Sequence, residues 1–369
     1  MKVGTLTFHG ADNYGAILQA YALQKAIVAL GYDCEIIDFF IPELFSGTDL
    51  EWPKDIISKY GIARGVIKSV NRWRMGCFSK RNKRANFSRF YKDYLHKSEK
   101  RYYTLSDLYN VEYDVIMFGS DQIWNKKITE HATDLYLGEF KTKKNIRRVS
   151  YAASNGTDRI PEELDDTFKH GLERFYRIST REKTLSKYIS NQYRLNSQDV
   201  LDPVFLLSKS DWKTIEGKLP YGIKKGKYIF VYTFDDQTTY QLARELSSKM
   251  DLPLVVLRWC GKSKRLTDMK QLFVNPPNDF ISLIANAALV CTSSFHGTAF
   301  SIIFEKDLYS VVPELLGQRI SDTVKQIGDP QKIQYNGSIV YHCNKEYYQT
   351  NNLRKLIAKS KEFIVDSLS

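Results

Sequence analysis

Hydrophobic and polar positions at the start of the chain follow first a strand-like and then a helix-like spacing. Residues 3–8 predict a buried strand, 9–15 a polar loop, 16–30 a helix and 34–39 a second strand, and Gly31 is placed to end the helix. This is a βαβ unit. Open α/β sheets bind ligands at the carboxyl ends of their strands, so we expect Asn13, Tyr14 and Gly15 in that loop to contact a substrate.

The same alternation continues along the chain. It predicts further strands at 113–118, 148–153 and 176–179, and then a second series: strand 227–234, helix 238–250, strand 254–259, helix 278–287, strand 288–291, helix 298–305 and strand 307–312. The pattern is interrupted at 196–210, and 369 residues exceed the size at which one core usually stops growing. We therefore predict an α/β protein with two Rossmann-like domains facing a cleft, 1–200 and 201–369, the second including a terminal helix.

Charge is concentrated in one stretch. Residues 54–101 hold fifteen Lys or Arg and three acidic residues, which equals the net charge of +12 of the whole chain. We expect a basic helical insertion here, because apolar residues recur at helical spacing from Ile56 to Trp73. Such a helix suits an anionic membrane surface, although a basic run is equally often a solvated face.

A second part of this stretch mixes aromatic and basic residues. Phe87, Phe90, Tyr91 and Tyr94 are interleaved with arginine and lysine, a composition also found in nucleic-acid-binding proteins. We expect no nucleic acid partner, because no nucleic-acid-binding module is recognisable and the rest of the chain resembles an enzyme.

The remaining composition bears on the compartment. Five cysteines are widely spaced and form neither a disulfide framework nor a zinc-binding pattern. Residues 1–8 are too short an apolar run for a signal peptide, and no stretch of about 18 apolar residues occurs. We expect a cytoplasmic protein, or one peripheral at the inner face of the cell membrane.

The segment 292–298 carries the strongest chemical signal. It follows an apolar run and opens into another, so it predicts a strand, a tight loop and a helix start. Free N–H groups of a first helical turn, with hydroxyls and a flexible glycine, favour an anion. The candidates are Ser293, Ser294, Gly297 and Thr298, with His296 placed to exchange a proton. The alternative is a serine that only caps the helix above a packed histidine.

Two other strand ends carry polar residues. The strand at 113–118 leads into Ser120, Asp121, Gln122 and Trp124, a set suited to hydroxylated substrates, or else a helix cap with the tryptophan packed beneath. Arg181 follows the strand at 176–179. It either pairs with the adjacent Glu182 or grips an anion.

Nucleotide cofactors have little support. The first loop contains neither the Gly-x-Gly-x-x-Gly pattern of dinucleotide-binding proteins nor a Gly-Lys-Ser/Thr phosphate loop. Asp38 lies where a ribose-binding acid would lie, but the preceding loop does not contain the glycines of a dinucleotide-binding site.

Four motifs together carry a family resemblance: NYGAILQAYAL at 13–23, GSDQIW at 119–124, Arg181-Glu182, and SFHG at 294–297. In this order and spacing they resemble the polysaccharide pyruvyl transferase family, over roughly residues 1–330. The resemblance implies a two-domain fold similar to GT-B glycosyltransferases. It also implies an enzyme that attaches the pyruvyl group of phosphoenolpyruvate as a ketal to a sugar of a surface polysaccharide precursor, as in capsule or exopolysaccharide.

The resemblance also implies residue roles. His296 would be the general acid or a phosphate ligand, Arg181 would hold the carboxylate or phosphate, and Asp121 would orient or deprotonate the acceptor hydroxyl. Phosphoenolpyruvate would be a co-substrate, with no other cofactor and no metal. The acceptor would be a sugar, carried on a polyprenyl diphosphate.

One position departs from the family pattern. Many similar pyruvyl transferases have arginine two residues before the histidine, whereas this chain has Ser294. Either another cation substitutes, with Arg319 and Arg258 as candidates, or the donor differs. Two other functions therefore stay open: a GT-B-type glycosyltransferase that uses a nucleotide sugar, and a non-enzymatic polysaccharide- or membrane-binding protein.

Overall fold

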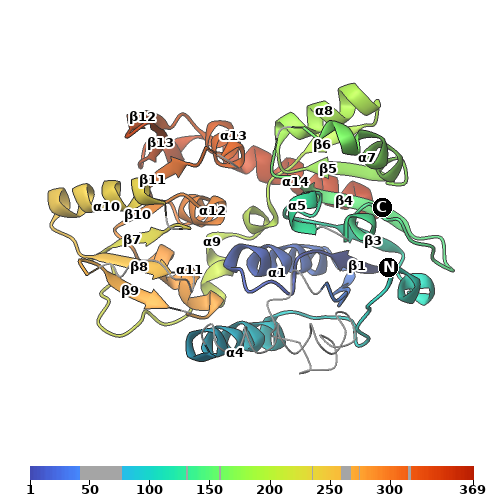
Figure 1. Ribbon diagram of the computed structural model, residues 1–369, viewed down its shortest axis with the longest axis horizontal. Helices are drawn as coiled ribbons and strands as arrows, with labels where there is room; N and C mark the ends of the chain where they lie inside the picture. Colours follow the sequence, from blue (N-terminus) through green and yellow to red (C-terminus); the bar gives the residue numbers. More distant parts are fainter. Residues whose placement is uncertain are drawn as a thin grey trace, which may run out of the picture.

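Two parallel-stranded sheets form the framework of the protein (Figure 1). The computed structural model describes residues 1–41, 77–129, 132–157, 159–234, 236–258, 267–273, 275–314 and 317–369, with the backbone alone for 77–84. The predicted basic amphipathic helix at 56–73 lies outside the described residues.

The first sheet is entirely parallel, in the order β2-β1-β3-β4-β5-β6. Its helices and strands are β1 (Lys2–Leu6), α1 (Tyr14–Ala29), β2 (Asp33–Ile36), α4 (Cys77–Tyr94), η1 (Leu105–Asn110), β3 (Val115–Phe118), α5 (Lys126–Thr129), α6 (Thr133–Tyr136), β4 (Arg147–Ala153), η3 (Glu162–Leu164), α7 (Asp165–Leu172), β5 (Arg177–Thr180), α8 (Lys183–Tyr193) and β6 (Ser197–Asp199). The central strands are buried on both faces, as parallel sheets covered by helices require.

The second sheet has the order β12-β13-β11-β10-β7-β8-β9. After η4 (Pro203–Leu206) and α9 (Lys209–Thr214) come β7 (Ile229–Tyr232), α10 (Gln237–Met250), β8 (Leu254–Arg258), β9 (Lys270–Phe273), α11 (Pro277–Ala285), β10 (Leu289–Thr292), α12 (Phe295–Ile303), β11 (Asp307–Val312), α13 (Gln318–Ile327), β12 (Gln331–Tyr335), β13 (Ser338–Cys343), η5 (Tyr347–Gln349) and α14 (Asn352–Leu368). The β12–β13 hairpin is antiparallel and was not predicted. Its turn, Asn336-Gly337, has positive φ at both residues, which is a typical hairpin signal.

The predicted βαβ opening is confirmed, with two differences at helix starts. Helix α1 begins at Tyr14 rather than residue 16, because the side chain of Asn13 caps it by accepting hydrogen bonds from the N–H groups of Gly15 and Ala16. Helix α12 begins at Phe295 rather than residue 298, because Ser294 is its N-cap. Gly31 follows α1 with φ +87°, in the left-handed region that favours glycine at this place.

One hydrophobic cluster is shared between the two sheets. The ring of Tyr14, at the start of α1, stacks on Phe280 of α11, with centroids 5.0 Å apart and an interplanar angle of 9°. The hydroxyl of Tyr14 donates a hydrogen bond to the carbonyl of Asn275 at 2.7 Å. The two units therefore pack through a continuous core rather than across an open gap.

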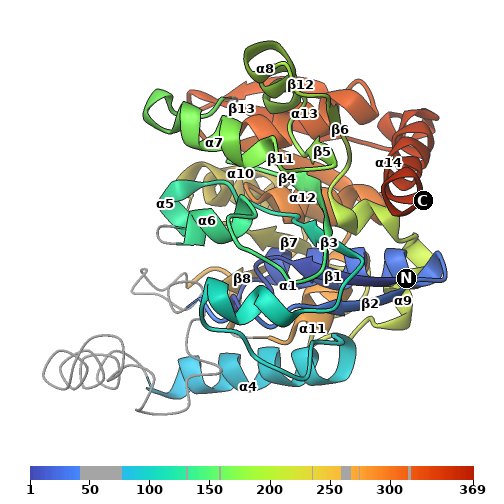
Figure 2. The same ribbon diagram turned by 90° about the vertical axis from the view of Figure 1, so that its right-hand side faces the viewer.

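Helix α4 forms part of that shared core. Phe87, Phe90 and Tyr91 are buried in it, and both ribbon views place α4 along α1 and α11 (Figure 2). These aromatic rings are packed inside the protein, so they cannot stack on nucleic acid bases. The mixture of aromatic and basic residues in the sequence is also found in nucleic-acid-binding proteins, but here the rings belong to the core.

The terminal helix α14 contacts both units: its first half packs on the cluster shared by the two sheets, and its second half covers a face of the first sheet. Phe363, Ile364 and Leu368 join a cluster with Val3 and Met117 of the first sheet. The reason is that this face of the first sheet is apolar, and an amphipathic helix is stabilised where it covers such a face. Among the described helices, none is long and apolar enough to cross a membrane.

Candidate functional site

Two strand ends and the segment after a third strand bring buried charged side chains together. Asp121 follows β3, Arg181 and Glu182 follow β5, and Asp202 lies between β6 and η4. Carboxyl ends of parallel strands meet at one edge of a sheet, which is why residues distant in sequence converge here.

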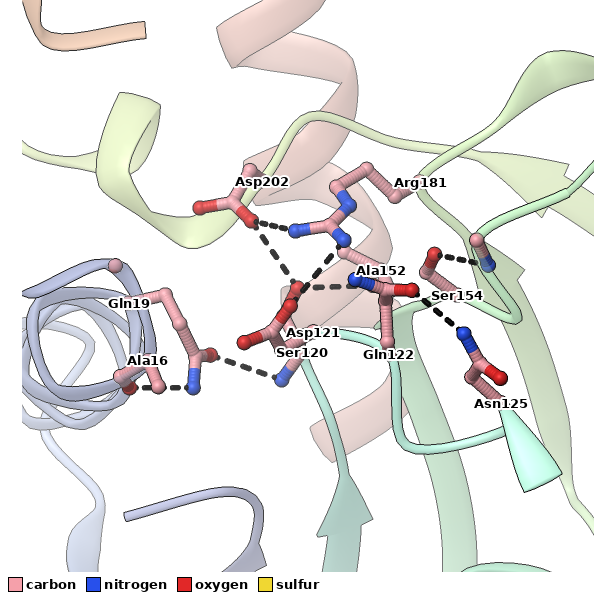
Figure 3. Close-up of polar contacts among 12 residues, drawn as sticks. Ala16, Gln19, Ser120, Asp121, Gln122, Asn125, Ala152, Ser154, Arg181 and Asp202 are labelled. Carbon is pink, nitrogen blue, oxygen red and sulfur yellow. Dashed lines mark hydrogen bonds and ion pairs between the residues drawn. The ribbon is translucent and has the colours of Figure 1, made fainter. Parts of the chain in front are cut away.

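Arg181 is the centre of this group. Its Nη1 donates to Oδ2 of Asp202 at 2.8 Å and its Nη2 to Oδ1 of Asp121 at 3.3 Å, while Nε lies 3.9 Å from Oε1 of Glu182 (Figure 3). The side chain is 2% exposed. Burial would lower the pKa of Arg181, but the three carboxylates raise it above its usual value. Arg181 therefore pairs with acids inside the protein, and it is not among the described residues that line the pocket between the two units.

The pKa values of the acidic partners are shifted in opposite directions. Burial would raise the pKa of Asp121, yet the positive charges of Arg181 and Arg319, and of His296 when it is protonated, hold it below its usual value. Burial raises the pKa of Glu182 despite Arg181, and the hydroxyl of Ser154 donates a hydrogen bond to it. Asp121 therefore stays ionised at neutral pH.

The start of helix α12 faces this group from the second unit. Its N-cap Ser294 accepts from the N–H of Gly297 at 3.4 Å. A Cβ at Gly297 would lie 2.3 Å from Oγ1 of Thr292, so the strand and helix approach each other closely only with glycine there. His296, in the first turn, has its Nε2 atom 3.8 Å from Oδ2 of Asp202.

The imidazole of His296 also touches the first helix. A Cβ built on Gly15 would lie 2.0 Å from Nδ1 of His296. Burial lowers the pKa of His296, Asp202 and Asp121 raise it, and Arg181 and Arg319 lower it further, with a net pKa below the usual value. His296 is therefore neutral in the free protein near pH 7.

Arg319, on α13, brings a second arginine. The ring of Phe295 is contacted by both guanidinium groups, at 4.7 Å from its centroid for Arg181 and 5.7 Å for Arg319. Burial and the charge of Arg181 lower the pKa of Arg319 to about 10, so it remains a cation at neutral pH. Its Nε atom is buried without a hydrogen-bond partner, and no carboxylate among the described residues lies within ion-pair distance of it.

These elements enclose a pocket of about 200 Å³. Its described lining comes from both units: Phe8, Ala11, Asn13, Ala16, Asp121, Gln122, Ile128, Phe234, Ser294, Phe295, His296 and Arg319. Arg319 is the permanently charged cation among them. A larger hollow of about 440 Å³ lies between α1, η4 and α14, but it holds none of the predicted site residues.

Several predicted site residues lie outside the pocket lining. Tyr14 packs between the two units, and Trp124 is buried against Phe168 and Phe175 with its Nε1 donating to the carbonyl of Tyr136. Both rings are too large and apolar to leave the core at these positions.

The small polar residues of the predicted set are engaged by the protein itself. Ser120 donates to the carbonyl of Ala152 and to Asp202, Ser293 shares a hydrogen bond with Thr233, and Thr298 bonds Ser294 and Ser310. Gly15 and Gly297 allow close packing. Arg258, the other candidate cation, donates to Gln271 and does not line the pocket.

Two further predicted or considered acids acquire different surroundings. Asp38 binds His9 at 3.0 Å, with Lys97 and Arg101 on its other oxygen, so its carboxylate is engaged by protein cations rather than open to a ribose. Asp202 is not among the predicted site residues, because it lies within 196–210, which we interpreted as the interruption between the two domains. Its position directly after a strand end is the same signal that indicated Asp121 and Arg181.

Metal binding receives no support from a ligand cluster: within the described ranges, no group of three or more His, Cys, Asp or Glu side chains is arranged to hold an ion.

Comparisons with solved structures establish the fold. A Listeria monocytogenes protein assigned as a UDP-N-acetylglucosamine 2-epimerase has a TM-score of 0.52 and 10% identity over 98% of this chain and 90% of its own. The Neisseria meningitidis UDP-GlcNAc 2-epimerase bound to UDP-GlcNAc has a TM-score of 0.49 and 10% identity, covering 100% and 99%. Arabidopsis thaliana UGT89C1 complexed with quercetin has 0.41 and 11%, covering 98% and 89%. The GT-B-like fold, with two parallel-sheet units, is confirmed.

Sequence comparison identifies the family. No curated protein sequence matches the chain significantly. The profile of the polysaccharide pyruvyl transferase family matches residues 13–311, which span all four motifs and most of both sheets. The protein therefore belongs to the polysaccharide pyruvyl transferase family, a family of transferases.

Proposed function

We propose that this protein transfers the pyruvyl group of phosphoenolpyruvate onto a hydroxyl pair of a sugar, forming a ketal in a surface polysaccharide precursor. The observation that carries the proposal is the meeting of Arg319 and His296 in one small pocket. A cation without a carboxylate partner suits a phosphate, and a histidine beside it suits a proton transfer.

Arg319 supplies the charge that Ser294 lacks. In this arrangement the guanidinium of Arg319, supported by the ring of Phe295, binds the donor's phosphate or carboxylate, and the start of α12 adds its positive end. Arg181 contributes indirectly, because it is tied to Asp121 and Asp202 and holds them in place. In this proposal, the donor's anionic group is bound by the N-terminus of α12 and by Arg319 of α13 together, and we call these two groups the anion clamp.

The proposed chemistry needs one proton donor and one acceptor. His296 gives a proton to the methylene carbon, and the oxygen of a first sugar hydroxyl bonds to the neighbouring carbon. The proton of that hydroxyl goes to His296, which has just lost its own. The carbon–oxygen bond to phosphate then breaks, and the second hydroxyl bonds to the same carbon as its proton leaves on the phosphate. The products are the ketal and inorganic phosphate. The bound donor's negative charge would raise the pKa of His296 and so supply the protonated form.

The acceptor would lie on the side of the pocket formed by the first unit. Asp121 and Gln122 line that side, and the ionised Asp121 can accept a hydrogen bond from a sugar hydroxyl. Phe234, more than half exposed, lines the same pocket from the second unit and offers an apolar face for a sugar ring. We propose a sugar linked to a polyprenyl diphosphate as the acceptor, which would bring the enzyme to a membrane surface.

The family profile, which matches residues 13–311, favours a pyruvyl donor over the nucleotide-sugar alternative.

The test is a reaction followed by mass spectrometry. Purified protein is incubated with phosphoenolpyruvate and candidate lipid-linked sugars, and with UDP-sugars in a parallel reaction. We expect a pyruvyl adduct on one acceptor together with stoichiometric phosphate release. A glycosyl adduct from the UDP-sugar reaction, without a pyruvyl adduct in the other, would refute the proposal in favour of a glycosyltransferase.

A further inference from the structure

His296 has one nitrogen without a partner. Its Nε2 atom is buried and makes no hydrogen bond, and the side chain is 10% exposed. A buried polar atom without a hydrogen-bond partner is destabilising. A group that forms a hydrogen bond with Nε2 when a ligand binds would therefore stabilise the bound state. Because Nε2 is buried and lies toward Asp202, we assign proton exchange with a ligand to Nδ1, which lies beside Gly15 at the start of α1.

The nearest acceptor is a carboxylate held rigidly in place. Oδ2 of Asp202 lies 3.8 Å from Nε2, and the Asp202 side chain is 0% exposed. Oδ2 accepts from Arg181 at 2.8 Å and from Ser120 at 3.3 Å, while Oδ1 accepts from the N–H of Val204 at 3.1 Å (Figure 3). These donors leave the carboxylate little freedom to turn away from the imidazole.

The two residues belong to different units. Asp202 lies in the segment between β6 and η4 and is bonded to the first unit, whereas His296 lies on α12 of the second. A relative movement of less than about 1 Å would shorten 3.8 Å to an ordinary hydrogen bond.

We propose that Asp202 is the positioning residue for His296, accepting a hydrogen bond from its Nε2 when donor binding draws the two units together. This inference rests on the proposed function. The bond would hold the imidazole beside Gly15 with its proton on Nε2, and Nδ1 would then exchange the proton with the substrate, as a carboxylate orients a catalytic histidine elsewhere.

The charges around His296 determine what this bond does. Asp202 and Asp121 favour the protonated ring, while burial, Arg181 and Arg319 oppose it. The hydrogen bond to Asp202 further stabilises the protonated ring. Nδ1–H can then give its proton to the methylene carbon of the donor. The sugar hydroxyl then returns a proton to Nδ1, so the ring is again protonated, as it was before the transfer.

The test compares Asp202→Asn with Ser120→Ala by NMR titration of labelled histidine, with His296→Gln to assign the signal. Ser120→Ala removes one hydrogen bond to Oδ2 of Asp202 but keeps the negative charge of Asp202. We expect the pKa of His296 in the free protein to fall by on the order of one unit in Asp202→Asn and to stay near the wild-type value in Ser120→Ala. An unchanged pKa in Asp202→Asn would overturn the inference. This arm needs no donor, so it is independent of whether the protein uses phosphoenolpyruvate.

Two further measurements complete the test. In wild-type protein with phosphoenolpyruvate, the NMR signals should report a proton on Nε2 bonded to a carboxylate, which remains measurable if Asp202→Asn does not fold. A proton on Nδ1 alone in that complex would overturn the inference. In steady state, Asp202→Asn should lower kcat by roughly 10- to 100-fold with little change in the KM for phosphoenolpyruvate. A raised KM with unchanged kcat would instead assign Asp202 to donor binding.

Discussion

Gly15 and His296 touch across the two units: a methyl group at Gly15 would lie 2.0 Å from the Nδ1 atom of the imidazole. The first helix therefore forms a wall against which the histidine of the second unit is placed. No residue larger than glycine fits there unless the ring moves.

Gly15→Ala should displace His296 and lower kcat by on the order of 100-fold, because a shift of about 1 Å in a catalytic group can have that effect. Helix propensity favours alanine over glycine, so α1 itself should not be weakened. Steady-state kinetics and urea denaturation check this. Wild-type kcat in a folded variant would show that the position of the ring tolerates the shift.

His296→Ala should lower kcat by roughly 100-fold or more if the residue transfers the proton. His170 is an exposed histidine on α7, and His170→Ala provides the matched control, with activity expected to equal that of wild type. Phosphate release from phosphoenolpyruvate in the presence of acceptor is the measurement. Near-wild-type activity of His296→Ala, with the fold intact, would remove this residue from the mechanism.

Arg319→Ala should weaken phosphoenolpyruvate binding by roughly 10- to 100-fold, since a charge-assisted bond contributes about 1.5–3 kcal/mol. Arg258→Ala is the control, because Arg258 bonds Gln271 and does not line the pocket. Titration calorimetry of both variants compares their affinities. Equal affinities for wild type and Arg319→Ala would place the anion clamp elsewhere.

Much of this arrangement could be predicted from the sequence, because its signals are local. The run of apolar residues followed by Ser294 and His296 indicates a strand, a cap and a helix start. What could not be predicted is which neighbours face the pocket. Tyr14 and Gly15 are adjacent, yet one packs in the core and the other against His296. The pairing of Arg181 with Asp202 and Asp121, rather than with a ligand, depends on three strand ends meeting in space.

Asp38 allows a stability prediction with a defined pH dependence. Burial would raise its pKa, but the bond from His9 and the charges of Lys97 and Arg101 lower it well below the usual range. A carboxylate with a lowered pKa stabilises the folded state above its unfolded-state pKa of about 3.9, and this contribution is lost as the pH falls further.

Asp38→Asn should therefore lower the free energy of unfolding by about 2 kcal/mol at pH 7, with a smaller difference from wild type below about pH 4. Asp268→Asn is the control, because Asp268 pairs with Arg244 at an exposed site and should matter little. Urea denaturation at both pH values is the measurement. A difference that grows toward low pH would contradict the prediction.

The basic segment allows a prediction from its sequence alone. Replacing Arg64, Lys68, Arg72 and Arg74 with glutamine should reduce sedimentation with anionic vesicles, since each basic residue near such a surface contributes about 1 kcal/mol. Activity on a short soluble acceptor should be spared. If the wild-type protein does not sediment with these vesicles even at low salt, the segment is an ordinary solvated surface.

Helix α14 covers the first sheet although it is the last helix of the chain. During synthesis, the apolar face that holds Val3 and Met117 is complete long before Phe363 and Leu368 emerge from the ribosome. Domains usually fold in the order in which they are made. The first unit is therefore completed only after the second has been made, and a nascent chain keeps this apolar surface uncovered until α14 has been synthesised.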